Sequence, residues 1–366
     1  MTVHVVGAGM AGLSAAFTLT KAGERVVLYD AAARSGGRCH SFFDKKLDAL
    51  IDAGTHLMLG ANTALLAMLR ECPTRTPLKN TGTKMLFFRQ DGTSFQIDTS
   101  RPLSAAARLP ELYSLLCESV MNTPANRADA ILFLKTAAKC FGKENGAVYL
   151  ASPSLFDSVV APVEQYLKQR GAVFRFGRRL RRVKDDGLVF FDGEEIELRG
   201  DDKAVLAIDS ENLSRLVVGA PELPFQTIAN IHYKTDVPLP ASFVGLVGMT
   251  GHWAFMKNGI VSVTISAAND LCARLSSDVL AQTVWRELST ALKFPFQTPP
   301  FRVVFEKRAT VLQTRIIGKR RPSADIGMKN VFVAGDFTKT ALPCTIEGAV
   351  RSGVTAARLI LNQRGF

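Results

Sequence analysis

The sequence predicts an α/β fold in which a Rossmann-like nucleotide-binding domain, built from both ends of the chain, is interrupted by a second domain. Three observations lead to this prediction. A glycine-rich strand–turn–helix segment lies near the amino terminus, a second strand–turn–helix segment lies near the carboxyl terminus, and short apolar runs alternate with helical patterns between them. With 366 residues the chain is long enough for two structural units.

The amino-terminal segment has the spacing G-x-G-x-x-G at Gly7, Gly9 and Gly12. A β-branched run over residues 3–6 is typical of a buried strand, and residues 13–21 have the composition of a helix. In such a turn the glycines allow a tight bend, the approach of a pyrophosphate, and close packing of helix on strand. The N–H groups of the helix N-terminus then face the phosphates. The segment predicts a dinucleotide site; the alternative is a small-residue turn that only packs.

A second apolar run over residues 25–29 ends at Asp30, which is placed to accept hydrogen bonds from a ribose. The motif R-x-G-G-R-x-x-S follows over residues 34–41, where Arg38 can neutralise phosphate charge. This combination resembles the amine-oxidase and phytoene-desaturase superfamily of FAD proteins, which implies FAD as the cofactor. The alternative is a Gly-Gly turn with a surface arginine. The FAD contacts predicted in this half are Gly7, Ala8, Gly9, Met10, Ala11, Gly12, Asp30, Ala31, Gly36, Gly37 and Arg38.

The resemblance implies a Rossmann-like FAD-binding domain (GR2-type flavoprotein) with an inserted mixed-sheet plus helical substrate domain. The FAD-binding domain is predicted to be discontinuous, over residues 1–60, 172–210 and 328–366. The substrate domain is predicted over residues 61–171 and 211–327.

A D-x-G-x-H core at residues 52–56, with apolar residues on both sides, predicts a loop folded against a ligand. Gly54, Thr55 and His56 are its predicted flavin contacts. His56 is conspicuous because the chain has only five histidines. A structural, hydrogen-bonded histidine is the alternative.

Residues 85–88 and 94–97 should pair as a hairpin, because Asp-Gly between two apolar runs is a strong turn signal. Helices of the substrate domain are predicted over residues 62–70, 103–141 with a break at 122–124, 156–170 ending at Gly171, and 277–292. The helices of 103–141 are expected to form a wall over the flavin. Residues 72–83 are expected to be a connection.

Short apolar runs predict the remaining strands. The strands that return to the nucleotide domain are expected over residues 172–176, 180–183, 188–191 and 204–208. The resemblance implies that Val183 supports the adenine. The mixed sheet beneath the substrate is expected over residues 228–233, 243–247, 260–265 and 301–307.

The carboxyl-terminal segment contains a buried strand over residues 331–334, which ends in Gly335-Asp336. Thr345 is placed to cap a helix over residues 346–361. The N-terminus of this helix would then point to where negative charge develops on a reduced flavin. The FAD contacts predicted here are Gly335, Asp336, Thr345 and Ile346, against the alternative of an ordinary strand–turn–helix.

The net charge is +12, with basic clusters at residues 175–184 and 319–321. Without a nucleic-acid motif, these clusters favour either a solvated face or attraction to an anionic membrane surface, and no nucleic acid is expected. No apolar run reaches the length of about eighteen residues typical of a spanning helix. Because the first strand begins at residue 2, no signal peptide is expected, and the prediction is a cytoplasmic protein with contact at the inner membrane face as an addition. The scattered cysteines predict neither disulfides nor a metal site.

Several segments together resemble one branch of the superfamily, the bacterial hydroxysqualene dehydroxylases. They are residues 52–60, 122–124, 263–268, 306–310 and 335–353, the last reading G-D-F-T-K-T-A-L-P-C-T-I-E-G-A-V-R-S-G. The chain departs from that branch in having Asp30 where Glu is more usual, and in being short near residues 98–118. The resemblance implies reductive removal of the hydroxyl of hydroxysqualene to give squalene, and hence a long apolar isoprenoid substrate.

That chemistry asks for a hydride from reduced flavin, a proton donor for the hydroxyl, and a dry apolar pocket. His56 is the first candidate for the donor, since its pKa can be moved across neutrality. Lys307 and Arg308 come next, with flavin-phosphate or surface pairing as their alternative role. A carotenoid-type desaturase, an amine oxidase and a catalytically silent FAD-binding protein remain open. The two tryptophans and five tyrosines, none in the carboxyl-terminal flavin segment, argue against an amine oxidase with an aromatic cage.

Overall fold

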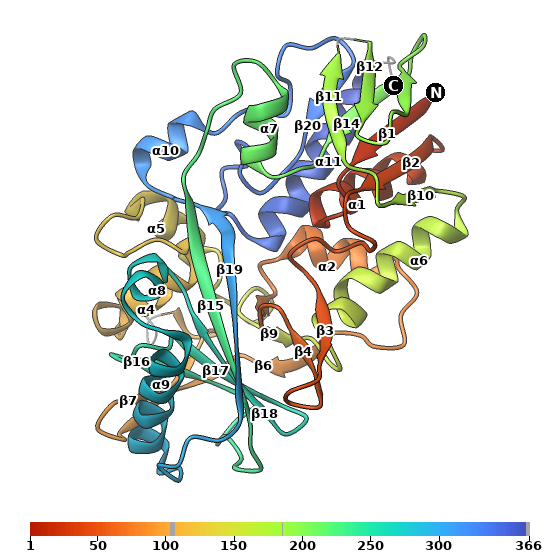
Figure 1. The fold of residues 1–366 in the computed structure, drawn as a ribbon. Coiled ribbons are helices and arrows are strands. Elements are labelled where there is room, and N and C mark those ends of the chain that lie inside the picture. The colour runs from red at the N-terminus through yellow and green to blue at the C-terminus, as the bar shows by residue number, and fades with distance from the viewer. Residues whose placement is uncertain (103–106, 185, 364–366) are drawn as a thin grey trace.

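The strands predicted to bind the nucleotide come together in one parallel sheet. In the computed structural model, which describes residues 1–102, 107–184 and 186–363, this sheet has five strands (Figure 1). Their order is β10 (Val173–Phe176), β2 (Arg25–Asp30), β1 (Thr2–Val6), β14 (Lys203–Leu206) and β20 (Val331–Val333), and every pairing is parallel. All three predicted ranges of the FAD-binding domain contribute strands, while the bounds of the domains stay a prediction.

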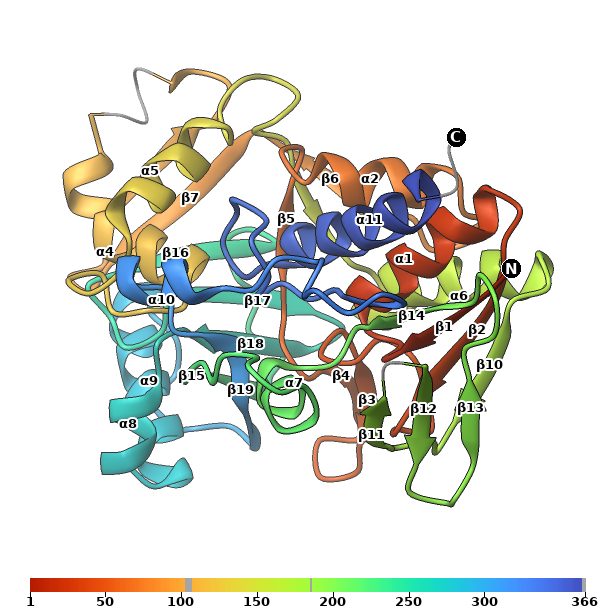
Figure 2. The ribbon, with the colours of Figure 1, turned by 90° about the horizontal axis from the view of Figure 1, so that it is seen from above.

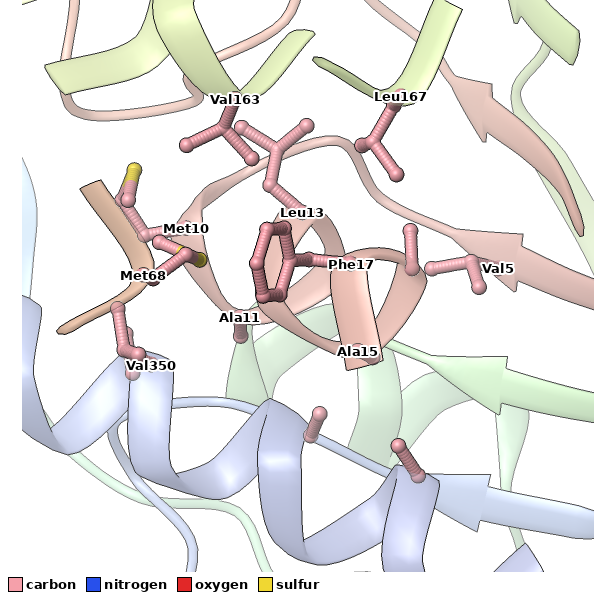
Figure 3. Close-up of a cluster of buried hydrophobic side chains, with 14 of the residues drawn as sticks. Val5, Met10, Ala11, Leu13, Ala15, Phe17, Met68, Val163, Leu167 and Val350 are labelled. Atoms are coloured by element: carbon pink, nitrogen blue, oxygen red, sulfur yellow. The ribbon is translucent and has the colours of Figure 1, made fainter. Parts of the chain in front are cut away.

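Helices cover one face of this sheet, and a small antiparallel sheet lies over the other. The helical layer consists of α1 (Met10–Lys21), α2 (Thr63–Arg70), α6 (Ala161–Gln169) and α11 (Ile346–Asn362) (Figure 2). Its apolar core is shown in Figure 3, where Met10, Met68 and Val350 lie together at one end and Val5 of β1 at the other. The opposite face packs on β11 (Leu180–Lys184), β12 (Gly187–Phe190), β13 (Glu195–Glu197) and α7 (Ser210–Leu216).

The predicted mixed sheet is confirmed, and it is larger than the sequence suggested. In the part of the chain that the structure describes it has seven strands, in the order β19 (Phe301–Val311), β15 (Phe225–Lys234), β18 (Ile260–Ile265), β17 (Trp253–Lys257), β16 (Phe243–Val247), β7 (Lys84–Arg89) and β8 (Ser94–Asp98). The pairing of β16 with β7 is parallel and the others are antiparallel. One face packs on α9 (Ser277–Leu292), with α8 (Asn269–Arg274) nearby.

The opposite face of the mixed sheet carries a second apolar layer. It contains side chains of β5 (Leu57–Leu59), β9 (Val148–Leu150) and α4 (Leu109–Met121), while β6 (Lys79–Gly82) pairs with β9 and α5 (Ala130–Ala138) packs against α4. The hairpin of β3 (Ser41–Asp44) and β4 (Ala49–Asp52) connects the two halves of the molecule. In Figures 1 and 2 the mixed sheet lies beside the nucleotide-binding sheet, and the loops after β1 and β20 lie between them.

Several local predictions are confirmed. The hairpin of β7 and β8 turns at Gly92, whose φ is +84°. Asn122 ends α4 in the left-handed conformation, at the predicted break between α4 and α5. The helix expected over 156–170 begins with a π-helical turn at Phe156–Val160, continues as α6, and stops before Gly171 with φ +82°. Of the predicted 103–141 helices, residues 103–106 lie outside the described residues, and the expected wall over the flavin stays a prediction.

The expectation that 72–83 is only a connection is wrong at its end. Lys79–Gly82 forms β6 and pairs with β9. The side chains of this K-N-T-G segment are mostly exposed, and its backbone alone pairs with β9. The segment therefore lacks the alternation of apolar residues by which a strand is predicted from sequence.

The two basic clusters of the sequence are not uniformly charged surfaces in the fold. In the first, Arg175 pairs with Glu194, Arg178 with Asp192, and Lys184 with Glu195. Asp192 and Glu194 lie in the turn between β12 and β13, and Glu195 begins β13, so these acids pair with three of the six cations of the sequence cluster. In the second, Arg321 is only 6% exposed and binds backbone carbonyls, which leaves Lys319 and Arg320 at the surface.

Helices α1 and α11 pack unusually closely where Gly353 faces α1. The Oγ of Ser14 donates to the carbonyl of Val350 over 2.9 Å. A Cβ on Gly353 would lie 2.1 Å from both the Ala11 carbonyl oxygen and Ser14 Oγ. This contact joins the helices that carry the first and last cofactor motifs.

Replacing Gly353 with alanine should therefore force α1 and α11 apart, because one of the clashing atoms belongs to the backbone. We expect the free energy of unfolding to fall by about 1–3 kcal/mol, measured by urea denaturation followed by circular dichroism. Gly318→Ala in α10 (Arg315–Arg320) is the matched control, since its Cβ would meet nothing within 4 Å. Equal destabilisation by both substitutions would contradict the close-packing argument.

Candidate functional site

The two glycine motifs predicted to hold a dinucleotide lie against each other. The N–H of Gly36 donates to the carbonyl of Ala8 over 2.8 Å, and Gly9 and Gly36 form a parallel bridge. A Cβ on Gly37 would lie 3.2 Å from the Cα of Gly9. Both Gly36 and Gly37 have positive φ, at +99° and +56°, which favours glycine. The predicted contacts from 7–12 and 34–38 thus form one continuous backbone surface.

This surface fits a pyrophosphate. Helix α1 begins after Gly9, which supplies no capping side chain, so the first N–H groups of the helix remain for an anion. The carboxylate of Asp30 accepts hydrogen bonds from the N–H of Ala8, over 2.7 Å, and of Ala32, over 2.8 Å. Asp30 therefore fixes the glycine turn against the end of β2. Its contact with a ribose stays a prediction, as does that of Ala31 with the cofactor.

The carboxyl-terminal motif reaches the same surface through an ion pair. Arg38 binds both carboxylate oxygens of Asp336, over 2.9 and 2.8 Å, and also donates to the carbonyl of Ala309. The Asp336 side chain is 7% exposed, whereas Arg38 is 43% exposed. Bidentate pairing of this kind fixes both position and orientation. Arg38 therefore holds the Gly335-Asp336 turn beside the glycine motifs, and direct contact of Asp336 with the flavin stays a prediction.

The helix after this turn begins as predicted. Thr345 Oγ1 accepts a hydrogen bond from the N–H of Gly348 over 3.2 Å and caps α11. A Cβ on Gly348 would lie 2.7 Å from the carbonyl oxygen of Pro343, so the chain can turn tightly into the helix only with glycine there. Ser352 Oγ accepts from the N–H of Gly335 over 2.9 Å. The start of α11 is thus fixed to the end of β20, which suits the predicted role of Thr345 and Ile346 at a flavin.

Glu347 has a role that the sequence did not indicate. Its two carboxylate oxygens accept from the N–H groups of Ala64 and Leu65, each over 3.0 Å, and so cap the N-terminus of α2. Arg351 binds the same carboxylate over 2.7 Å and the hydroxyl of Thr63 over 2.7 Å. The T-I-E-G-A-V-R-S-G pattern therefore ties α2 and β20 to α11.

Arg321 is a second residue that sequence reasoning missed. Its guanidinium donates to the carbonyls of Asp336, Phe337 and Leu342 and to the hydroxyl of Thr340. A buried guanidinium that serves several carbonyls of one loop fixes the shape of that loop. No local pattern could have found it, because every partner lies in residues 336–342.

His56 lies in the predicted flavin loop, beside the mixed sheet. Its Nδ1 lies 2.9 Å from the carbonyl oxygen of Gly54, so Nδ1 carries the proton, because a carbonyl only accepts. Asn230 of β15 donates to the carbonyl of Ala53 over 3.1 Å and anchors this loop to the sheet. Burial lowers the pKa of His56 from its ordinary value of 6.5. The free Nε2 is therefore unprotonated at neutral pH and can take up a proton to become a comparatively strong acid.

The other two candidates for the proton donor do not join His56 in a buried site. Arg308 forms an ion pair with Glu211 over 2.6 Å and is 51% exposed. Lys307 is also exposed. A solvated cation does not suit a dry pocket, and for Arg308 the alternative of surface pairing is what the structure shows. Val183 is partly buried on β11 and packs against the core beneath the small antiparallel sheet, and its predicted contact with adenine stays a prediction.

Three internal segments that carried the resemblance converge on one buried polar network. Asn122 donates to Thr310 Oγ1 over 3.0 Å and accepts from the N–H of Ala267 over 2.7 Å. Thr123 accepts from the N–H of Gln313 over 2.9 Å, and the Gln313 side chain in turn accepts from the N–H of Cys344 over 2.8 Å. The network therefore connects the end of α4 and the mixed sheet to the loop that precedes Thr345.

An apolar cluster follows His56 directly. β5 begins at Leu57, and Leu57 and Leu59 pack against the mixed sheet. The cluster combines Met85, Phe87, Ile97, Leu112, Leu115, Val148, Phe243, Trp253 and Phe255. Trp253 and Phe255 both lie on β17 of the mixed sheet. The predicted polar flavin contacts and this buried apolar cluster thus adjoin at the loop of residues 53–59.

Comparisons with known proteins agree with this geometry. A model of the family described as flavin containing amine oxidoreductase matches residues 10–145 and 141–361. Hydroxysqualene dehydroxylase from Zymomonas mobilis is 34% identical over 411 aligned positions, which cover 98% of this chain and 99% of the relative. The hydroxysqualene dehydroxylase of Sinorhizobium fredii is 31% identical, covering 99% of this chain and 98% of the relative. The aligned positions outnumber the 366 residues, in agreement with a chain shorter than its relatives.

A solved oxidoreductase from Methanosarcina mazei superposes with a TM-score of 0.74 at 12% identity, covering 98% of this chain and 100% of its own. That likeness shows the fold alone, and it confirms the predicted α/β architecture. The family match and the two relatives that align over the whole chain identify the cofactor as FAD and the class of enzyme as an oxidoreductase. The chain is therefore an FAD-dependent oxidoreductase that belongs to the flavin-containing amine oxidoreductases and, within them, to the hydroxysqualene dehydroxylases.

Proposed function

We propose that the protein removes the hydroxyl group of hydroxysqualene by reduction and releases squalene and water. The observation that carries the proposal is the junction at residues 53–59, where the histidine of the flavin loop runs directly into an apolar cluster. The two relatives that match the whole chain are named for this activity. A long hydrocarbon with one hydroxyl group needs this combination of one polar group and a wide apolar surface.

Reduced FAD supplies the hydride for this reaction. The backbone of the glycine motifs and the N-terminus of α1 would hold the pyrophosphate, and the N-terminus of α11 would face the flavin ring. Arg38 and Arg321 keep the loop between β20 and α11 in the shape that this contact requires.

His56 is the proposed proton donor to the departing hydroxyl. Its Nδ1–H is held by the carbonyl of Gly54, so proton uptake and release fall to Nε2. Because burial lowers the pKa of His56, its imidazolium form is a stronger acid than free imidazolium, although it is less populated at neutral pH. The carbon–oxygen bond breaks as the proton arrives, and water leaves.

The apolar cluster after His56 would hold the hydrocarbon chain and exclude water. An allylic carbon that loses its hydroxyl becomes cation-like, and water competes with hydride for such a centre. The aromatic side chains Phe87, Phe243, Trp253 and Phe255 are all buried in this cluster.

No helix among the described residues is long and apolar enough to cross a membrane. A location in the cytoplasm, with contact at the inner face of the membrane, is part of the proposal. It is supported by the apolar substrate, which partitions into bilayers.

The proposed reaction is tested by mixing anaerobically reduced holoenzyme with hydroxysqualene. We expect the flavin spectrum to return to the oxidised form with a matching yield of squalene. Reduction of the oxidised enzyme by a polyene or an amine, without reaction of hydroxysqualene, would instead favour a desaturase or an amine oxidase. A flavin inert toward all three would indicate a silent FAD-binding protein.

The role of His56 predicts a pH dependence. The acid must be protonated, so single-turnover reoxidation should accelerate as pH falls through 6.5 and level off below the lowered pKa of His56. His56→Gln keeps a hydrogen-bonding side chain but should lose this dependence and react about 100-fold more slowly at low pH. The flavin content of the variant, read from its absorbance, separates loss of the acid from loss of FAD. The same pH profile in both proteins would exclude His56 as the donor.

A further inference from the structure

We propose that the outer faces of helices α5 and α10 form a docking surface for an anionic lipid bilayer. The proposal rests on the apolar substrate inferred above, and it adds the surface by which the enzyme would meet that substrate. This α5–α10 surface consists of Ile131, Leu134, Lys135 and Lys139 at α5 with Arg315, Ile316, Lys319 and Arg320 of α10.

Helix α5 has apolar residues on both of its faces. Phe133 is 1% exposed and packs against Cys117 and Met121 of α4. Ile131 and Leu134 point outward and are 51% and 47% exposed. A helix that is apolar all round is normally buried in a protein core or in a membrane. The described residues cover only the face of α5 that carries Phe133. The apolar side chains of its outer face are therefore left exposed.

Helix α10 presents the same combination. Ile317 is buried beneath the helix, while Ile316 is 74% exposed between cationic neighbours. Thr314 caps the helix through the N–H of Ile317 over 3.3 Å, which fixes the outward direction of Ile316.

The two helices start at the same place. The N–H of Asp129, the N-cap of α5, donates to the carbonyl of Gln313 over 2.9 Å, and α10 begins two residues after Gln313. In Figures 1 and 2 both helices lie on the side of the molecule away from the nucleotide-binding sheet. Their exposed apolar residues therefore belong to one region of the surface.

The charge of this region matches an anionic bilayer. Neither α5 nor α10 contains an acidic residue. Among the described residues, the five cations of the α5–α10 surface form no ion pair, whereas Arg175, Arg178 and Lys184 of the cluster at 175–184 do. Each unpaired Lys or Arg near an anionic membrane surface adds to binding, and apolar side chains between the cations can enter the interface.

Hydrogen bonds of Gln313 connect the α5–α10 surface to the predicted flavin site. Gln313, which bonds to the N-cap of α5 through its backbone, accepts the N–H of Cys344 with its side chain over 2.8 Å. Cys344 precedes Thr345, the cap of the helix that faces the flavin. A bilayer held against α5 and α10 would therefore lie next to the region where an apolar substrate reacts.

The test is cosedimentation of the full-length holoenzyme with vesicles of phosphatidylcholine alone, or with about one-third phosphatidylglycerol. We expect binding to the anionic vesicles at least tenfold tighter than to the neutral ones. Lys319→Glu with Arg320→Glu should weaken binding to the anionic vesicles at least thirty-fold, since two cations are lost. Ile131→Gln, Leu134→Gln and Ile316→Gln together should weaken binding to both kinds of vesicle.

Matched controls place the same changes elsewhere on the surface. Val218→Gln with Phe296→Gln removes exposed apolar side chains, and Arg181→Glu with Arg182→Glu reverses two exposed charges. Control variants that weaken vesicle binding as much as the test variants would overturn the proposal. So would a parent protein that binds neutral and anionic vesicles equally well, or that binds neither. A parent protein that is a dimer in solution, with an apolar variant that is a monomer but binds vesicles as before, would assign the surface to a second copy of the chain. That result would also overturn the proposal.

A second readout keeps this inference separate from the proposed reaction. With anaerobically reduced enzyme and hydroxysqualene in detergent micelles, the surface and control variants should reoxidise at the parent rate, and only vesicle-borne substrate should reveal a difference. A parent protein that binds anionic vesicles but converts no hydroxysqualene would leave the surface standing and refute the reaction. Slower turnover of the variants in micelles would show damage to the enzyme itself and refute the docking role.

Discussion

The close approach of α1 and α11 is the contact on which the rest of the structure depends. Gly353 allows α11 to lie against the backbone of α1 at Ala11, and Ser14 bonds across the same contact. Each helix begins at a loop that carries predicted FAD contacts. The packing of these two helices therefore determines whether the first and the last segments of the chain can hold one cofactor together.

Around that contact, hydrogen-bonded charged groups hold the loops of the site in fixed shapes. Arg38 joins the glycine motifs to the Gly335-Asp336 turn, and Arg321 holds the loop that follows this turn. Glu347 caps α2 from the first turn of α11. These side chains fix the backbone of the loops. The glycine spacing alone would allow many loop conformations, so these additional residues are needed to select one.

The parts of the site that could be predicted from sequence depend on local backbone geometry. The turns at Gly7 and Gly36, the cap at Thr345 and the break at Asn122 each follow from the conformational preferences of one or two residues. The missed parts depend on partners distant in the chain. Arg321 sits beside Arg320 in the sequence, and only the fold buries one and exposes the other. The paired acids opposite the 175–184 cluster could likewise not be predicted, because the turn between β12 and β13 meets these cations only in the folded chain.

The central claim is that both ends of the chain bind a single FAD. Hydrogen–deuterium exchange of the apoprotein, titrated with FAD, tests it most directly, because exchange reports the opening of each segment separately. Exchange should slow at residues 7–12, 34–38 and 345–349 together, with the same FAD concentration at half-effect. Protection confined to the amino-terminal segments, with 345–349 unchanged at saturating FAD, would contradict it.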